Sequence, residues 1–319
     1  MDVTKRKYLE LKKLIEQTEE RGYGSLSEEH ILNLHSLYRY LINDLARTRR
    51  DYPGSLREKE LNKLAARVHN TLLTGGRIRL SKVTAFFQRD LPLCMRRYMH
   101  FIVISILFFF TGSVFAYLFI NLNPDKAHYI LDPRLIDNAE RGFKDENFEK
   151  RGDAWQEGPM FVTFYVSNNT KVAFTAFALG IFLALPTVLM LFYNGIAMGG
   201  TVAIVDKAGL THNLLGFISP HGGIELMAIF LAAAAGLILG LTVLNPGRLP
   251  RAEALKKSAY DVISLVIAAA LMLCAAALIE GLISPLPFDN RIKYAIGIVN
   301  LVLVLSYVFS GFFMKRPPD

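Results

Sequence analysis

Cysteine and tryptophan are scarce in this chain of 319 residues, which has two cysteines and one tryptophan. Two cysteines cannot form the disulfide framework of a small secreted domain. One of them, Cys274, lies deep in an apolar block, so we expect Cys94 and Cys274 to be free thiols. We also expect no cleaved signal peptide, because the first apolar block begins near residue 101, too late for such a leader.

Catalytic motifs are missing as well. The sequence has no P-loop, no His-Glu-x-x-His zinc-protease motif and no set of nucleophile and base at a recognisable spacing. We therefore expect a protein that is not an enzyme and that has no cofactor and no resident metal. A membrane enzyme is the least favoured of the functions considered below.

Basic residues outnumber acidic ones before the first apolar block. Residues 1–100 carry 20 Lys and Arg against 12 Asp and Glu, whereas residues 123–170 carry 6 against 9. A nucleic-acid-binding protein could have the same basic excess, but no groove-reading motif accompanies it, so no nucleic acid is expected as a partner. In a membrane protein this excess predicts that the part before the first apolar block stays in the cytoplasm.

Long apolar blocks dominate the rest of the chain. Taken as a whole, the chain is 52% hydrophobic and has a mean hydropathy of +0.30. The blocks are residues 101–122, 172–193, 195–217, 226–244, 262–283 and 294–314. A bilayer crossing takes about 20 apolar residues. The sequence therefore predicts an all-α, polytopic helical membrane protein with about six hydrophobic segments, of which the third is broken or re-entrant.

The blocks divide the chain into four predicted parts. Residues 1–98 form a cytoplasmic helical domain, 99–122 the first transmembrane helix, 123–170 an extracytoplasmic acidic segment and 171–319 a transmembrane core. In the first part, Ser27 can cap one helix, and Ser55 with Glu58 forms a capping box for the next. Residues 81–95 fit either a helix lying in the membrane interface or one more soluble bundle helix.

Basic residues also predict the orientation. The flanks of the blocks are basic at Arg96 and Arg97, in the connector 245–259, and at Lys315 and Arg316. All three lie in the cytoplasm, with both termini, only if the stretch 195–217 crosses the membrane. If that stretch is re-entrant, every later segment flips.

Ionisable residues within the blocks need a reason, because a charge at the bilayer centre costs at least about 2.5 kcal/mol. Asp206 and Lys207 interrupt the third stretch. They fit either a loop whose side chains reach water or the polar lining of an interrupted helix.

The run from Ser219 to Glu225 is the most informative segment. Pro220 and Gly222 suggest a break, with a new helix beginning near Gly222 and Glu225 in its first turn. His221 lies four residues before Glu225, so the two can hydrogen-bond if the turn is helical. Three readings remain open: a structural helix cap, a ligand or proton site, and a metal site that His212 would have to join.

Two further features allow two readings each. Glu280 either snorkels to the membrane surface or faces the bundle and meets His221 or Lys207. Small residues recur every four positions at Ala232, Gly236 and Gly240, a row suited to packing within the monomer or to a homodimer face.

The order of these motifs resembles the stage II sporulation protein M family over about residues 85–314. The matching motifs are Pro92 before Arg96–Arg97, Asn168–Asn169, Asn194–Gly195 between the second and third spans, Pro220–His221–Gly222 with Glu225, and Glu280 with Ser284–Pro285. The helical N-terminal region is similar to the extension of non-sporulating members.

The resemblance implies a non-enzymatic scaffold or partner subunit of a cell-envelope complex in the bacterial inner membrane. The implied partners are peptidoglycan-degrading envelope enzymes, or MoxR-type ATPases and von Willebrand A-domain proteins, besides the lipid bilayer itself. The alternative is a transporter or flippase with a polar intramembrane site. The candidate residues for a ligand or structural polar site are His221, Glu225, Glu280, Asn194, Lys207, Asn168, Asn169, Pro220 and Gly222.

Overall fold

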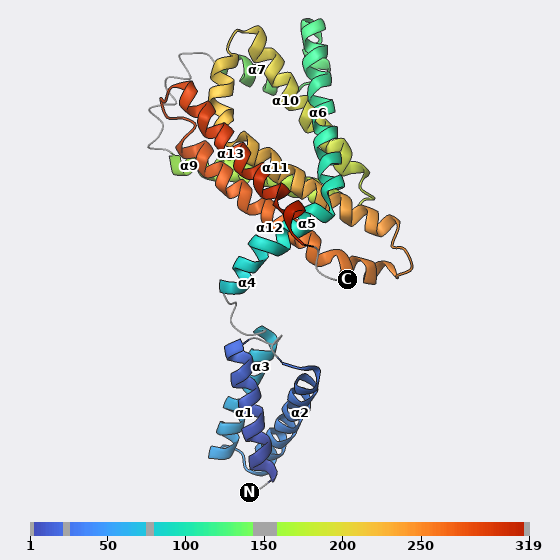
Figure 1. The fold of residues 1–319 in the computed structure, drawn as a ribbon, viewed down its shortest axis with the longest axis vertical. Coiled ribbons are helices and arrows are strands. Elements are labelled where there is room, and N and C mark those ends of the chain that lie inside the picture. Colours follow the sequence, from blue (N-terminus) through green and yellow to red (C-terminus); the bar gives the residue numbers. More distant parts are fainter. Residues whose placement is uncertain (1–2, 22–25, 75–79, 143–157, 316–319) are drawn as a thin grey trace. The chain divides into compact units, whose positions relative to one another are not determined.

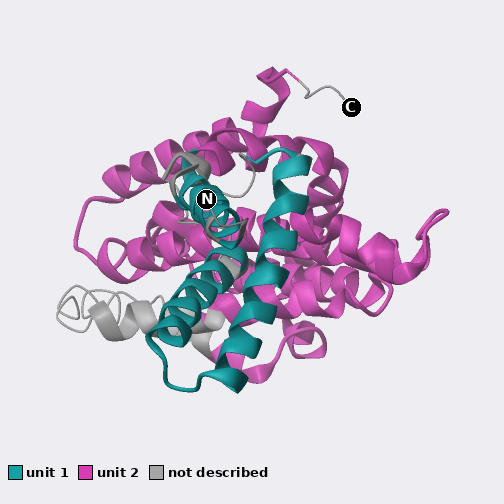
Figure 2. Ribbon diagram, turned by 90° about the horizontal axis from the view of Figure 1, so that it is seen from below, with its two compact units in different colours: residues 1–84 teal, residues 85–319 magenta. Residues whose placement is uncertain are grey.

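The computed structural model describes residues 3–21, 26–74, 80–142 and 158–315, and these ranges contain helices and no strand (Figure 1). The predicted all-α class is thereby confirmed. The chain divides into two compact units, Met1–Thr84 and Ala85–Asp319 (Figure 2).

The first unit is a bundle of three helices, α1 (Val3–Arg21), α2 (Glu28–Asp51) and α3 (Leu56–Thr74). Each helix turns an apolar stripe inward, and the stripes bury a common core. The core residues are Leu11, Leu14, Ile15, Leu26, Leu34, Leu37, Leu41, Leu61, Ala65 and Val68.

The helix starts of this bundle follow the sequence closely. The Ser27 side chain accepts a hydrogen bond from the His30 amide and caps α2 as predicted. At α3, the Glu58 amide donates to Ser55 Oγ at 3.2 Å, but the Glu58 carboxylate accepts from the Gly54 amide, one residue before the cap. The capping box at α3 is therefore formed with Gly54 in place of the Ser55 amide.

The second unit holds the membrane helices. Its elements begin within α4 (Leu80–Ala85) and continue with η2 (Phe86–Asp90), α5 (Leu91–Arg97), α6 (Met99–Leu122), η3 (Pro124–Tyr129), α7 (Pro133–Gly142), α9 (Gly158–Leu179), α10 (Leu185–Lys207), α11 (Thr211–Leu244), α12 (Arg251–Leu282), α13 (Asn290–Ser310) and η5 (Gly311–Phe313). Among the described residues, five helices are long and apolar enough to cross a membrane: α6, α10, α11, α12 and α13 with η5. A multi-pass membrane protein follows from these helices.

Helices α6 and α10 run side by side in the same direction (Figure 1). A Cβ atom at Gly195 would meet the Phe109 carbonyl, and one at Gly199 would meet the Ser113 carbonyl. The pairing continues to the ends of both helices, where Lys207 Nζ donates to the Asn121 carbonyl. Residue numbers rise in the same direction along both helices, so the chain between them must run back to the end where α6 begins. Helix α9 runs in this opposite direction.

The later helices alternate in the same way. Gly297 lies against Ser219, and Asn300 donates to the Pro220 carbonyl at 2.9 Å, so α11 and α13 are parallel with α12 running back between them. Helix α9 has the direction of α11, because Ala176 lies against Gly236 and residue 180 against both Gly236 and Gly240. The six helices α6, α9, α10, α11, α12 and α13 thus alternate in direction.

The basic flanks meet at one end of this unit. The Arg97 guanidinium forms an ion pair with Asp261 on α12 at 2.7 Å. The Arg96 side chain donates to the carbonyls of Gly311 and Met314, at the end of α13. The start of α6, the start of α12 and the end of α13 therefore share one end of the unit, which we call the arginine end.

The predicted boundaries of the second and third spans are wrong. Helix α9 ends at Leu179, and the chain bends over residues 180–184, where Leu183 and Ala184 adopt positive φ angles. Helix α10 then runs without interruption through Asn194 and Gly195. That pair was predicted to join two spans, but Gly195 instead allows the backbones of α10 and α6 to approach closely.

The predicted helix break at Pro220 is also wrong. Helix α11 is continuous for 34 residues with Pro220 inside it, so Glu225 lies in the helix interior and not in a first turn. A proline inside a helix leaves one carbonyl without its usual amide donor, and neighbouring side chains in a membrane protein can compensate for such losses. Here the close packing of α13, with Asn300 bonded to the Pro220 carbonyl, holds this part of α11 in place.

Other expectations have partial outcomes. Residues 81–95 form three pieces, α4, the π-helical η2 and α5, and Leu91, Cys94 and Met95 of α5 are buried in the core of the second unit. Cys94 and Cys274 are free cysteines, as predicted. In the acidic segment, α7 forms at Pro133–Gly142, whereas Trp155 lies outside the described residues.

Candidate functional site

Two helices of the second unit and the turn after one of them contribute polar side chains to one cluster. Helix α11 supplies His221 and Glu225, which lie four residues apart and therefore on the same face of the helix. The end of α12 supplies Glu280, and Ser284 lies in the turn that follows this helix. The two helices have opposite directions and extensive mutual contacts, which brings these side chains together.

The imidazole of His221 is the centre of this cluster. Its Nε2 atom lies 3.7 Å from Glu225 Oε2 and 3.7 Å from Glu280 Oε1. The His221 side chain is only 2% exposed, and Glu280 is 7% exposed. The snorkelling reading of Glu280 is therefore wrong, and the structure brings it to His221 and not to Lys207.

Ser284 holds one side of the His221 imidazole. Its Oγ atom lies 2.9 Å from His221 Nδ1 and 3.4 Å from the Ile279 carbonyl oxygen. A hydroxyl has one hydrogen, so when Ser284 donates it to the Ile279 carbonyl, Nδ1 donates to Ser284. In that tautomer of the neutral ring Nε2 carries the free lone pair, which faces the two carboxylates.

Further polar groups hold the outer side of the cluster. Asn169 on α9 donates to Glu280 Oε2 at 3.4 Å, and the ring of Phe217 packs edge-on against His221. Lys293 on α13 is 2% exposed and donates to the Ser284 carbonyl at 2.8 Å. Four helices thus supply the cluster and its supports.

The chemistry available to this cluster is that of proton or cation binding. Its core has two carboxylates and one imidazole lone pair, which are all acceptors when unprotonated. The Glu280 side chain is 9% exposed and the Glu225 side chain is 20% exposed. Two carboxylates that face one lone pair at this depth favour a proton or a cation between them, since an uncompensated charge away from water is costly. His221, Glu225 and Glu280 are therefore the residues that could hold a metal ion.

The other predicted site residues lie apart from the cluster or support it indirectly. Asn194 donates to the Met190 carbonyl within α10, and Lys207 is exposed at the end of that helix. Pro220 and Gly222 are buried beside His221 on α11. The side chain of Asn168 lies outside the described residues.

Asp206 and Lys207 end α10 and do not interrupt a span. Asp206 accepts hydrogen bonds from Tyr117 and Thr211, and it is exposed. Both side chains are exposed, as the loop reading of Asp206 and Lys207 predicted, although the two residues belong to the last turn of α10.

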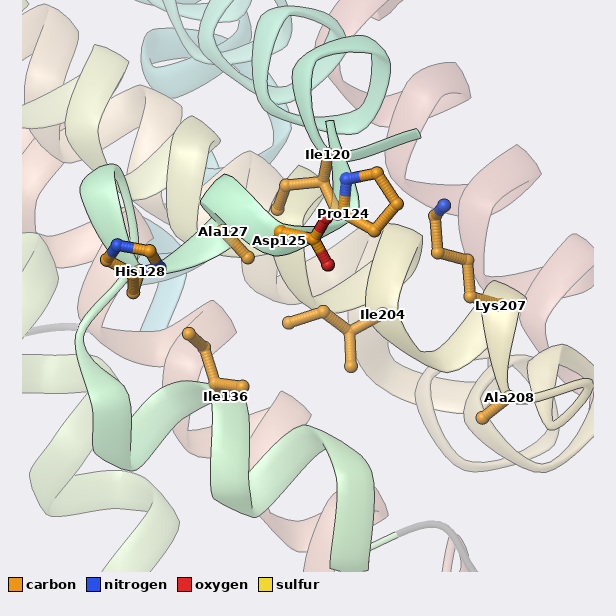
Figure 3. A pocket seen from close by; sticks show the side chains of 9 residues that line it. All are labelled: Ile120, Pro124, Asp125, Ala127, His128, Ile136, Ile204, Lys207 and Ala208. Carbon is orange, nitrogen blue, oxygen red and sulfur yellow. The ribbon is translucent and has the colours of Figure 1, made fainter. Parts of the chain in front are cut away.

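A second feature is an open cavity of about 520 Å³ at the end opposite the arginine end. It lies between the end of α6, η3, α7 and the end of α10 (Figure 3). Its lining residues are Ile120, Pro124, Asp125, Ala127, His128, Ile136, Ile204, Lys207 and Ala208. In Figure 3 the Lys207 and Asp125 side chains stand at its rim, so Lys207 belongs to this cavity and not to the His221 cluster.

Sequence reasoning missed Lys293. It immediately precedes the sixth apolar block, 294–314, and charged residues usually precede such blocks at the membrane surface. The only feature of the sequence that points to Lys293 is its position nine residues after Ser284. The short turn between α12 and α13 brings the first turn of α13 back beside Ser284.

The small-residue row on α11 packs inside the chain. Gly236 lies against the backbone of Ala176 and Phe177, and Gly240 lies against Ala184. The row is therefore occupied by α9 and the bend after it, as in the reading of packing within the monomer.

Models of two protein families match the chain, one in each unit. The family model of stage II sporulation protein M matches residues 105–285, which is more than half of the chain. A domain of unknown function, DUF8413, matches residues 3–74 in the helical bundle. Neither a curated protein nor a solved structure matches the chain. The protein accordingly belongs to the stage II sporulation protein M family and carries an additional helical domain at its N-terminus.

Proposed function

We propose that this protein is a non-enzymatic scaffold of the bacterial inner membrane, which recruits partner proteins through its N-terminal bundle. The observation that carries the proposal is the division into two units, since the bundle has a buried core of its own and a membrane-helix unit follows it. A bundle that needs no membrane helix to bury its core is suited to act as a docking module.

The proposed orientation has both termini in the cytoplasm. Arg96 and Arg97 share one end of the second unit with Asp261 and with the end of α13. The positive-inside rule then assigns the arginine end to the cytoplasm and the cavity end to the outside. The bundle would recruit cytoplasmic partners, for which MoxR-type ATPases and von Willebrand A-domain proteins are the candidates. The cavity end would face envelope enzymes.

The test compares the full chain with a chain that lacks residues 1–74, both expressed in native membranes and cross-linked before purification. We expect partners that are captured by the full chain and lost from the truncated one, while both chains remain in the membrane. If the two chains capture the same proteins, or none, the docking role of the bundle is refuted.

Transport is the second candidate function, and the buried His221 cluster is what favours it. Ionisable residues within membrane helices often mark the path of an ion or proton. The measurement is proton and cation flux in liposomes containing the full chain, with Glu280→Gln and His221→Ala as site variants and the exposed Glu253→Gln as control. Transport through the cluster requires flux that both site variants abolish and the control retains.

A further inference from the structure

We propose that His221, Glu225 and Glu280 bind one divalent transition-metal ion within the membrane unit. His221 Nε2 and one oxygen from each carboxylate all lie within 4.8 Å of one another. The site is independent of the scaffold role, because a structural ion would serve a scaffold and a transporter equally.

The distances suit an ion better than direct hydrogen bonds. Nε2 lies 3.7 Å from each carboxylate oxygen, which is beyond hydrogen-bond length. Zinc bonds of about 2.0–2.2 Å in a tetrahedral site place neighbouring ligand atoms about 3.4 Å apart. An ion at the centre would therefore draw Nε2 and each carboxylate oxygen together by only a few tenths of an ångström, while the two carboxylate oxygens begin within 4.8 Å of each other.

Charge gives a second reason. The described polar atoms that face the carboxylates at hydrogen-bond distance include the amide of Asn169, which is neutral. A divalent cation would offset both carboxylate charges in an environment where unpaired charges are costly. It would also use the lone pair of His221 Nε2, which the tautomer leaves free.

The supports behind two of the three ligands, His221 and Glu280, are a third reason, and they are independent of the distances. A histidine that binds a metal usually donates its other ring N–H to a fixed acceptor, and a carboxylate ligand is itself hydrogen-bonded. His221 Nδ1 bonds to Ser284 at 2.9 Å, and Glu280 Oε2 accepts from Asn169 while Oε1 faces the histidine. Each of these ligands is held on the side away from the others.

The ligand set indicates the class of ion. One imidazole nitrogen and two carboxylate oxygens suit Zn²⁺, Mn²⁺ or Fe²⁺, whereas Cu⁺ prefers sulfur and Ca²⁺ takes six to eight oxygens. Three protein ligands leave a fourth position for water or for a bound group.

The first experiment measures Zn²⁺ binding to the purified full chain in lipid nanodiscs, after chelator treatment and equilibrium dialysis. We expect one Zn²⁺ per chain, and an affinity lowered more than 10-fold by His221→Ala, Glu225→Gln or Glu280→Gln. The controls are His100→Ala and Glu253→Gln, whose side chains are exposed and lie outside the cluster, and they should bind as the unmodified chain does. Binding no greater than that of empty nanodiscs, or binding that all three site variants retain, would overturn the proposal.

A second experiment keeps the proposal testable if the site variants fail to fold. X-ray absorption of the Zn²⁺-loaded, unmodified chain should give nitrogen and oxygen neighbours at about 2.0–2.2 Å, with no sulfur at about 2.3 Å. Sulfur ligation would assign the ion to a cysteine and refute the site. Ser284→Ala tests the support of His221, and we expect it to lower Zn²⁺ affinity by about 10- to 100-fold.

Discussion

The two units of this protein differ in the charged and ionisable residues that they bury. The bundle of α1, α2 and α3 buries apolar side chains together with Thr18, Thr48 and Thr71, and it leaves ion pairs such as Arg67–Glu19 on its surface. The membrane unit exposes large apolar side chains such as Leu107 and Val299 and buries His221, Glu280 and Lys293. The difference follows from the solvent, because lipid offers no penalty to exposed apolar groups and no partner to exposed polar ones.

This contrast also changes what holds the helices together. Burial of leucine from water stabilises the bundle, whereas in lipid the association of helices depends on close packing and on hydrogen bonds between them. Glycines at the contact of α6 and α10 and polar groups between α11, α12 and α13 match that expectation.

The largest effect is expected from Gly195→Leu in α10. A Cβ at this position would collide with the backbone carbonyl of Phe109, and a backbone atom cannot move aside as a flexible side chain can. We expect a loss of more than about 4 kcal/mol in the free energy of unfolding, seen as loss of monodisperse protein after extraction. A Cβ added at Gly54 would meet nothing within 4 Å, so Gly54→Leu tests the strain of a positive φ angle without a steric clash. Equal losses of stability in the two variants would contradict the packing argument.

In the bundle, Leu34→Ala should cost about 2–5 kcal/mol, because Leu34 is fully buried and its loss leaves a cavity. The measurement is urea unfolding of residues 1–84, followed by circular dichroism. These residues should fold alone as a helical monomer, since their core contains none of the membrane helices. The control is the exposed Leu32→Ala, which should change stability by no more than about 0.5 kcal/mol. A disordered fragment would refute the independence of the unit.

The bundle was the easier unit to predict from the sequence. Its helices alternate apolar and polar positions with helical spacing, and cap residues such as Ser27 mark where they begin. Membrane helices are apolar on every side, so the same pattern is missing. The bend at 180–184 exposes Ile181, Phe182 and Leu183, which are as apolar as the helices beside it, and hydropathy therefore gave the wrong boundary.

The site was predictable in part, through topology. The basic flanks predicted alternating spans, and alternation placed His221 and Glu280 in the same half of the membrane, where the structure brings them together. The continuity of α11 through Pro220 was not predictable, because Pro220 and Gly222 close together are typical of a break and the side chain that packs there, Asn300, lies 80 residues later in the sequence. Lys293 was missed because a charged residue that precedes an apolar block ordinarily lies at the membrane surface.

A smaller effect is expected from Asp261→Ala at the arginine end. Asp261 accepts hydrogen bonds from Arg97 at 2.7 Å and from Tyr98 at 3.0 Å. Burial, and then the Asp261 carboxylate, raise the pKa of Tyr98 to about 12, so the phenol stays protonated as a donor. Removal of its acceptor should cost about 1–3 kcal/mol, measured by thermal unfolding in nanodiscs, with the exposed Glu253→Ala as control. Equal stability of the two variants would mean that this pair behaves like the surface pairs of the bundle.

The smallest effect is expected from Glu19→Gln in the bundle. The hydrogen bond from Arg67 lowers the pKa of Glu19 below its usual 4.5 in the folded state. Its stabilisation is therefore present above pH 4.5 and is lost as the pH falls through the folded pKa. Both side chains are more than a third exposed, so water screens the pair and the contribution should be about 0.2–1 kcal/mol. Urea unfolding of residues 1–84 should separate the variant from the unmodified fragment at pH 7, and the gap should narrow as the pH falls below 4.5. A gap that does not narrow in acid would assign the loss to packing and not to charge.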